Sequence, residues 1–270
     1  MRGNVRVHQK KIIAKRRKKA LIVSSVALSV FAIVVGGFAF LTHADFVRVE
    51  EVRVTGNVRL SEEYVQSVAN GLLEGKYLGM FSRRAVFLYP HDAIEGSLSD
   101  MPVVKGVRVG SEGLRAIEVA LEERGEVARF CDGEAGDFSQ CFAVDEEGFV
   151  FSSSGDSSLI AYRDASVVNA LGKSLLTSDD FKSLQFFMRE LGILGVAPRE
   201  IVIGEAGYVT VFLGGGGRLI VNTVDDLSDV LSNLSSVLND KSLATSSADF
   251  LSRLDYMRLD AGNKVFYKAR

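Results

Sequence analysis

The chain contains two cysteines, Cys131 and Cys141, and the nine residues between them are rich in acidic side chains and glycine. In an oxidising compartment, two thiols at this spacing form a disulfide that supports a hairpin. A second interpretation is a site for a hard cation, because Asp132, Glu134 and Asp137 offer oxygen ligands. The segment lacks the twelve-residue pattern and closing glutamate of an EF-hand, so we expect a disulfide and neither a metal ion nor another cofactor.

Residue types that commonly carry catalysis occur here without the neighbours that catalysis needs. The serines at 152–154 have no nucleophile-elbow context, and the glycines at 214–217 are not followed by the Lys-Ser/Thr of a phosphate loop. The acidic residues at 145–147 indicate a turn. The chain has three histidines, and the first two belong to the N-terminal region: His8, His43 and His91. We therefore expect a non-enzymatic protein without catalytic residues.

A membrane anchor is the clearest element of the sequence. Residues 1–19 carry nine basic side chains and no acidic one, and residues 20–41 carry no charge at all. As a helix, this apolar run would be roughly 33 Å long, which is enough to cross a hydrocarbon core about 30 Å thick. Because basic flanks stay in the cytoplasm, we expect a single-pass cell-membrane protein whose later domains are extracytoplasmic. A cleaved signal peptide is the alternative, although the apolar run exceeds the usual length of a signal core.

Charge divides the chain in the same way. The whole sequence has 32 basic and 34 acidic residues, and nine of the basic ones lie in the tail, so the remainder carries 11 more acidic than basic residues. The basic tail suits anionic membrane lipids, which attract each Lys or Arg near the surface by about 1 kcal/mol. The acidic remainder argues against nucleic acid as a partner.

Residues 45–125 are expected to form a first extracytoplasmic domain. Residues 46–54 alternate as a strand, Ser61 suits a helix N-cap, and a second helix lies between residues 82 and 98, interrupted or started by Pro90. Two strands, at residues 103–109 and 114–121, complete a β-α-α-β-β order. With the motifs Val54-Thr55-Gly56-Asn57 and Pro102-Val103-Val104-Lys105-Gly106, this segment resembles a POTRA domain. Arg124 is expected to form an ordinary ion pair with Glu123.

Residues 126–270 are expected to form a second domain, of mixed α/β type with an antiparallel sheet. A hairpin turns at Gly148, a helix spans residues 179–191 with a cap at Thr177 or Ser178, and three strands follow from residue 199 to 221. Another helix starts at Thr223 or Asp225. Residues 249–253 suit a short helix or a strand, and the chain closes with a hairpin whose strands are residues 254–259 and 264–268.

The order of these parts resembles the bacterial cell division protein family FtsQ/DivIB. The closing segment carries the resemblance furthest, through Asp255-Tyr256-Met257-Arg258 followed by a turn and the strand from Lys264 to Tyr267. The fold class is then α+β: one transmembrane helix, a POTRA-like domain and an FtsQ-type β domain. The resemblance implies a scaffold at the division septum that links FtsB-like and FtsL-like bitopic proteins to the septal peptidoglycan synthesis machinery.

The resemblance also implies that the last strand offers its free edge to the partner. Aromatic and arginine side chains dominate binding hot spots, and the residues expected to bind the partner are Tyr256, Arg258, Leu259, Val265, Phe266 and Tyr267. Strand register decides which of them face the partner, and packing in the core is an equal alternative for Phe266 and Tyr267. A POTRA-bearing, membrane-anchored protein of envelope export or assembly is the second functional hypothesis, and an extracytoplasmic hydrolase or sensor is the third.

Overall fold

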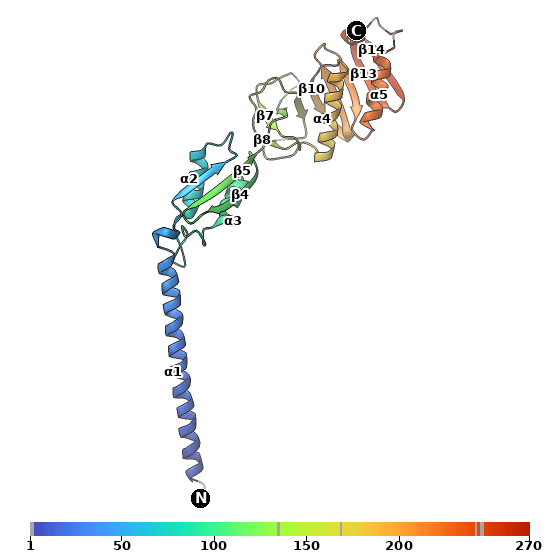
Figure 1. Ribbon diagram of the computed structural model, residues 1–270. Helices are drawn as coiled ribbons and strands as arrows, with labels where there is room; N and C mark the ends of the chain where they lie inside the picture. The colour runs from blue at the N-terminus through green and yellow to red at the C-terminus, as the bar shows by residue number, and fades with distance from the viewer. Residues whose placement is uncertain (1–2, 134–135, 168, 241, 244–245) are drawn as a thin grey trace. The chain divides into compact units, whose positions relative to one another are not determined.

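The computed structural model describes residues 3–133, 136–167, 169–240, 242–243 and 246–270, without the side chains of residues 3–17 and 20. The chain divides into two compact units (Figure 1). Unit 1 comprises Met1–Met101 and Gly106–Glu122, and unit 2 comprises Pro102–Lys105 and Glu123–Arg270.

Unit 1 begins with the long helix α1 (Gly3–Leu41). Its segment Leu21–Leu41 is apolar and long enough to cross a membrane, and none of that segment is buried. The helix ends against the rest of unit 1, because the Thr42 side chain is buried and its Oγ1 accepts a 3.2 Å hydrogen bond from the backbone N–H of Ser82. The basic side chains of the tail, up to Arg17, lie outside the described residues.

The remainder of unit 1 is a small sheet with two helices. Its elements follow in the predicted order, with an additional hairpin between the helices, whose two strands have two residues each. The elements are β1 (Glu51–Thr55), α2 (Glu62–Leu73), β2 (Lys76–Tyr77), β3 (Phe81–Ser82), α3 (His91–Ser99), β4 (Val104–Glu112) and β5 (Ala116–Glu123). The central strand β5 pairs with β1 in parallel and with β4 on its other side. As predicted, Ser61 caps α2, and its Oγ accepts from the N–H of Tyr64. Pro90 directly precedes α3.

Unit 2 is built on one nine-stranded sheet. The strands are β6 (Ala128–Cys131), β7 (Cys141–Val144), β8 (Val150–Ser153), β9 (Ala161–Asp164), β10 (Pro198–Ile203), β11 (Tyr208–Leu213), β12 (Arg218–Asn222), β13 (Leu254–Ala261) and β14 (Lys264–Ala269). In space their order is β14-β13-β12-β11-β10-β9-β6-β7-β8. The last hairpin of the chain therefore forms one edge of the sheet, and β8 forms the other.

The expectation of an antiparallel sheet is wrong, because the sheet is mixed. Strand β10 runs parallel to β9, and β13 runs parallel to β12. Parallel neighbours need a crossover, and helices supply it in these two cases. Strand β6 also runs parallel to β9, and strands β7 and β8 lie between them in the sequence. The helix α4 (Ser178–Ile193) connects β9 to β10, and α5 (Leu227–Leu238) with α6 (Ser247–Arg253) connects β12 to β13.

The core of unit 2 lies between the sheet and these helices. Helices α4 and α5 lie side by side over one face of the sheet (Figure 1). Their apolar stripes are buried there, with Phe181, Leu184 and Phe187 from α4 and Val230 and Leu234 from α5. On β11 and β12, every second residue points into this core, among them Val209, Val211, Leu219 and Val221. The residues between them consequently point to the opposite face of the sheet.

Candidate functional site

Strand β14 borders the sheet, and among the described strands it pairs only with β13. It pairs antiparallel with β13, with Met257 opposite Tyr267 and Arg258 opposite Phe266. The N–H of Arg270 bonds to the carbonyl of Arg253, on the β13 side. Backbone N–H groups alternate in direction along a strand, so the N–H of Phe266 points toward β13 and that of Tyr267 points to the free edge. A partner strand could therefore bond to β14 without disturbing its pairing with β13.

The six residues predicted to bind a partner fall on two faces of this hairpin. Tyr256, Arg258 and Phe266 lie on the face opposite the helices, where Phe266 is 55% exposed. Tyr267 and Val265 lie on the helix side, where the Tyr267 ring meets the Phe250 ring edge-on at 5.2 Å and Val265 packs against the core. Leu259 is only 2% exposed and belongs to the core. We therefore omit Leu259 from the candidate surface.

The register of the strands aligns the residues that point away from the helices in rows across four strands, and these residues are exposed or half-buried. One row follows the pairs Lys268–Tyr256, Tyr256–Arg218 and Arg218–Phe212, and the next follows Phe266–Arg258, Arg258–Ile220 and Ile220–Thr210. The Arg218 guanidinium lies 6.0 Å from the centre of the Tyr256 ring, at the outer limit of a cation–π contact. We call this surface the open face, defined by Thr210, Phe212, Arg218, Ile220, Tyr256, Arg258, Lys264, Phe266 and Lys268.

The open face carries more positive than negative charge. Its four cations are Arg218, Arg258, Lys264 and Lys268, and two carboxylates neighbour them. Lys268 Nζ lies 3.3 Å from Asp255 Oδ2, and Arg258 donates to Asp260 at 2.6 and 3.1 Å. The hydrogen bonds from Arg258 lower the pKa of the Asp260 carboxyl. A face with basic groups among aromatic and aliphatic side chains suits an acidic, amphipathic partner.

Sequence reasoning did not select Phe212, Arg218 and Ile220, although it predicted their strands. Burial alternates along β11 and β12, and these three residues occupy the outward positions. Large apolar or arginine side chains at outward positions of a strand are the signal that could have identified them. Their distance in sequence from the last hairpin concealed the common surface, because only the register of β12 against β13 brings them together.

The two cysteines are bonded to each other, and they lie opposite each other on β6 and β7. A buried arginine supports the loop between them. The Arg163 guanidinium pairs with Glu200, and it donates to the carbonyls of Cys131, Asp132, Gly133 and Asp137. Glu134, one of the residues considered for a metal site, lies outside the described residues. Among the described residues, no three His, Cys, Asp or Glu side chains lie together as metal ligands would.

The expectation that Arg124 pairs with Glu123 is wrong, because Arg124 pairs with Asp145. Within unit 2, Arg124 Nη1 lies 2.5 Å from Asp145 Oδ2, and the guanidinium also lies over the Phe149 ring at 4.3 Å. Asp145 is buried, and its other carboxylate oxygen accepts from the N–H groups of Glu147 and Phe149. The acidic turn is therefore a structural element organised by Asp145.

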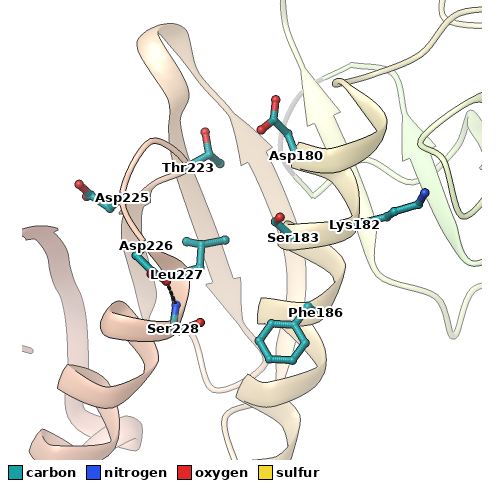
Figure 2. A pocket seen from close by; sticks show the side chains of 9 residues that line it. All are labelled: Asp180, Lys182, Ser183, Phe186, Thr223, Asp225, Asp226, Leu227 and Ser228. Atoms are coloured by element: carbon teal, nitrogen blue, oxygen red, sulfur yellow. Dashed lines mark hydrogen bonds between the residues drawn. The ribbon is translucent and has the colours of Figure 1, made fainter.

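A cavity of about 420 Å³ lies where α4 and α5 begin (Figure 2). In Figure 2, Lys182 and Asp225 point away from each other, and the one hydrogen bond drawn is the N-cap bond from Ser228 to Asp226. The arrangement brings no nucleophile and base together among the residues drawn. Its lining residues are Asp180, Lys182, Ser183, Phe186, Thr223, Asp225, Asp226, Leu227 and Ser228.

No protein-family model and no curated protein sequence matches the chain. The candidate site consequently rests on the geometry of the β14 edge and the open face.

Proposed function

We propose that this chain is a non-enzymatic, single-pass membrane scaffold of the bacterial division machinery, of the FtsQ/DivIB type. It captures a small bitopic partner of the FtsB or FtsL kind on the β14 edge and links it to septal cell-wall synthesis. The observation that carries the proposal is the unpaired edge of β14 beside the open face.

The edge and the open face supply two different kinds of binding energy. An extended partner segment can add to β14 through main-chain hydrogen bonds, which are largely independent of sequence. Specificity then comes from side chains, and the open face offers Phe266 and Tyr256 as apolar anchors and Arg218 as a charge. A partner that continues from a strand into an acidic amphipathic helix would use both surfaces.

The remaining features agree with this role. Helix α1 contains one segment, Leu21–Leu41, that is apolar and long enough to anchor the chain in a membrane. The basic tail favours the cytoplasm for the N-terminus, and units 1 and 2 would then lie on the extracytoplasmic side. The order strand, helix, helix, strand, strand in unit 1 supports a POTRA-like module. A disulfide in unit 2 agrees with an oxidising compartment.

Photocrosslinking in dividing cells tests the proposal. A photoreactive amino acid at Phe266 or Tyr256 should capture a small single-pass coiled-coil protein at the septum. The same group at Ile193, which is 72% exposed at the end of α4, is the matched control and should not. Capture of envelope-export components alone, or equal capture from all three positions, would contradict the division role.

A backbone substitution tests edge pairing separately from side-chain contacts. Tyr267→Pro removes the N–H that points to the free edge, whereas Tyr267→Ala removes the same ring and keeps that N–H. We expect partner binding to be weaker in the proline variant than in the alanine variant. Equal binding by the two variants would mean that strand addition at Tyr267 does not contribute.

A further inference from the structure

The hairpin of β2 and β3 in unit 1 exposes apolar side chains close to the end of α1. Leu78 at its tip is 87% exposed and Met80 is 47% exposed, and Phe46 and Phe87 are also exposed. Leu78 has a φ of +50°, which is a left-handed conformation that turns usually assign to glycine or asparagine. Neither solubility nor turn geometry favours leucine here, so an apolar environment is the simplest explanation for its presence.

Aromatic contacts fix the hairpin at the level where α1 would leave the membrane. The Phe38 ring lies 5.8 Å from the Phe81 ring and 5.6 Å from the Phe87 ring. Phe38 is part of the apolar segment Leu21–Leu41 and precedes its end by three residues. At 1.5 Å per residue, Phe38 lies about 5 Å inside that end. Residues that contact Phe38 must therefore lie at the membrane interface if α1 spans the bilayer.

A basic pocket lies at the base of the same hairpin. Its lining includes three cations, Arg48, Lys76 and Arg84, against one carboxylate, Glu74. Arg84 is held in place, because it donates to the carbonyl of Val49 at 3.3 Å and to Asn70 Oδ1 at 3.1 Å. The hydroxyl group of Thr42 and the imidazole group of His43, which directly follow α1, also belong to the lining. The lining suits a phosphate group, and the outer-leaflet headgroups are the phosphates nearest to the end of a spanning α1.

We propose that unit 1 binds the outer leaflet of the membrane. The apolar side chains of Leu78 and Met80 enter the interface, and Arg48, Lys76 and Arg84 bind the phosphate of an anionic phospholipid headgroup. This inference depends on the membrane anchor, which is part of the proposed function. It does not depend on any division partner. It assigns the β2–β3 hairpin the task of fixing the height and tilt of unit 1 above the bilayer.

A fluorescent label at the hairpin tip tests the apolar contact. The described part of the native chain has no free thiol, so Leu78→Cys provides a thiol for an environment-sensitive NBD dye. Val58→Cys is the matched control, since Val58 is also 87% exposed in unit 1 but follows the far end of β1. In the full chain reconstituted in nanodiscs, we expect NBD at residue 78 to shift to the blue and to be quenched by nitroxide-bearing lipids, and NBD at residue 58 to remain in water.

The same label tests the headgroup site. Nitroxide-bearing phosphatidylglycerol should quench NBD at residue 78 more strongly than nitroxide-bearing phosphatidylcholine at equal mole fraction. Arg48→Gln with Lys76→Gln should remove most of that preference, since each cation near an anionic surface contributes about a five-fold effect. A preference that survives the double substitution would overturn the headgroup site.

Three outcomes separate this inference from the anchor on which it depends. A chain that does not enter the nanodiscs would contradict the anchor and the inference together. A chain that enters them with a water-exposed label at residue 78 would overturn the inference alone. A blue shift without quenching by lipid-borne nitroxides would mean that protein covers Leu78, and it would also overturn lipid binding.

Discussion

Arg124 and Asp145, which are 21 residues apart, form an ion pair at 2.5 Å with both side chains largely buried. Asp145 also accepts two backbone N–H groups of its own turn, so the pair joins the start of unit 2 to the β7–β8 turn. Removing one partner of a buried pair leaves an uncompensated charge and costs about 3 to 5 kcal/mol. We expect Arg124→Ala to lower the free energy of unfolding of unit 2 by about that amount, as measured by chemical denaturation of the detergent-solubilised chain.

Arg253→Ala, which lies in the same unit, is the matched control for this prediction. Arg253 also bonds to a carboxylate, at 2.7 Å to Asp249, but its side chain is 57% exposed. Exposed pairs contribute about 1 kcal/mol or less. If the two alanine variants lose similar stability, the Arg124–Asp145 pair has no special role in the fold.

Local signals in the sequence predicted the local structure well. Thr177 caps α4 as predicted, and its Oγ1 accepts from the N–H of Asp180. The start of α5 was predicted less well, because four neighbouring residues have side chains that can cap a helix: Asn222, Thr223, Asp225 and Asp226. Only Asp226 caps α5. Val224 N–H bonds to the Asn222 side chain and Asp225 N–H to the Asn222 carbonyl, so a turn occupies the expected start.

Relationships that depend on distant parts of the chain could not be predicted. The parallel pairs β9–β10 and β12–β13 follow from helical crossovers, and the parallel pair β6–β9 follows from the strands β7 and β8 between them, whereas periodicity reports only which residues alternate. The open face required the register of β12 against β13, which places Ile220 beside Arg258. Arg124 pairs with Asp145 and not with its sequence neighbour Glu123, because the fold places the acidic turn beside Arg124. The sequence could therefore indicate the edge of the sheet that we propose binds a partner, but not the full surface beside it.

The disulfide is expected to stabilise its loop without affecting partner binding. Crosslinking a loop of about ten residues contributes about 3 kcal/mol in the chain-entropy description. We expect Cys131→Ala with Cys141→Ala to lower the free energy of unfolding of unit 2 by about 2 to 3 kcal/mol. Strands β6 and β7 lie toward one edge of the sheet and β14 forms the other, so partner affinity should stay within two-fold. A large loss of affinity in a folded double variant would contradict this separation.

Arg258 should control the titration of Asp260. Hydrogen bonds from Arg258 are the largest cause of the lowered Asp260 pKa. A lowered carboxyl pKa adds stability that is present above the unfolded value, about 3.9, and is lost as pH falls through the folded value. Arg258→Gln should raise the pKa of Asp260, because the hydrogen bonds that lower it are removed, and carboxyl ¹³C NMR with selectively labelled aspartate follows this change. Arg253→Gln, which removes a bond to Asp249 instead, should leave Asp260 unchanged.

The charge and the aromatic groups of the open face should act on different rate constants of partner binding. Arg218 is exposed on β12, so its charge should act mainly while an acidic partner approaches. We expect Arg218→Glu to lower the association rate constant and to weaken its dependence on salt. Lys182→Glu makes the same change of charge on α4, the helix that covers the opposite face, and should have little effect. Surface plasmon resonance with the captured partner measures the association rate constant. Equal effects of Arg218→Glu and Lys182→Glu would show that the partner does not approach through the open face.

Phe266→Ala should instead raise the dissociation rate constant about ten-fold, because an apolar anchor that loses its contact costs about 1 to 2 kcal/mol. The same surface plasmon resonance experiment measures this dissociation rate constant.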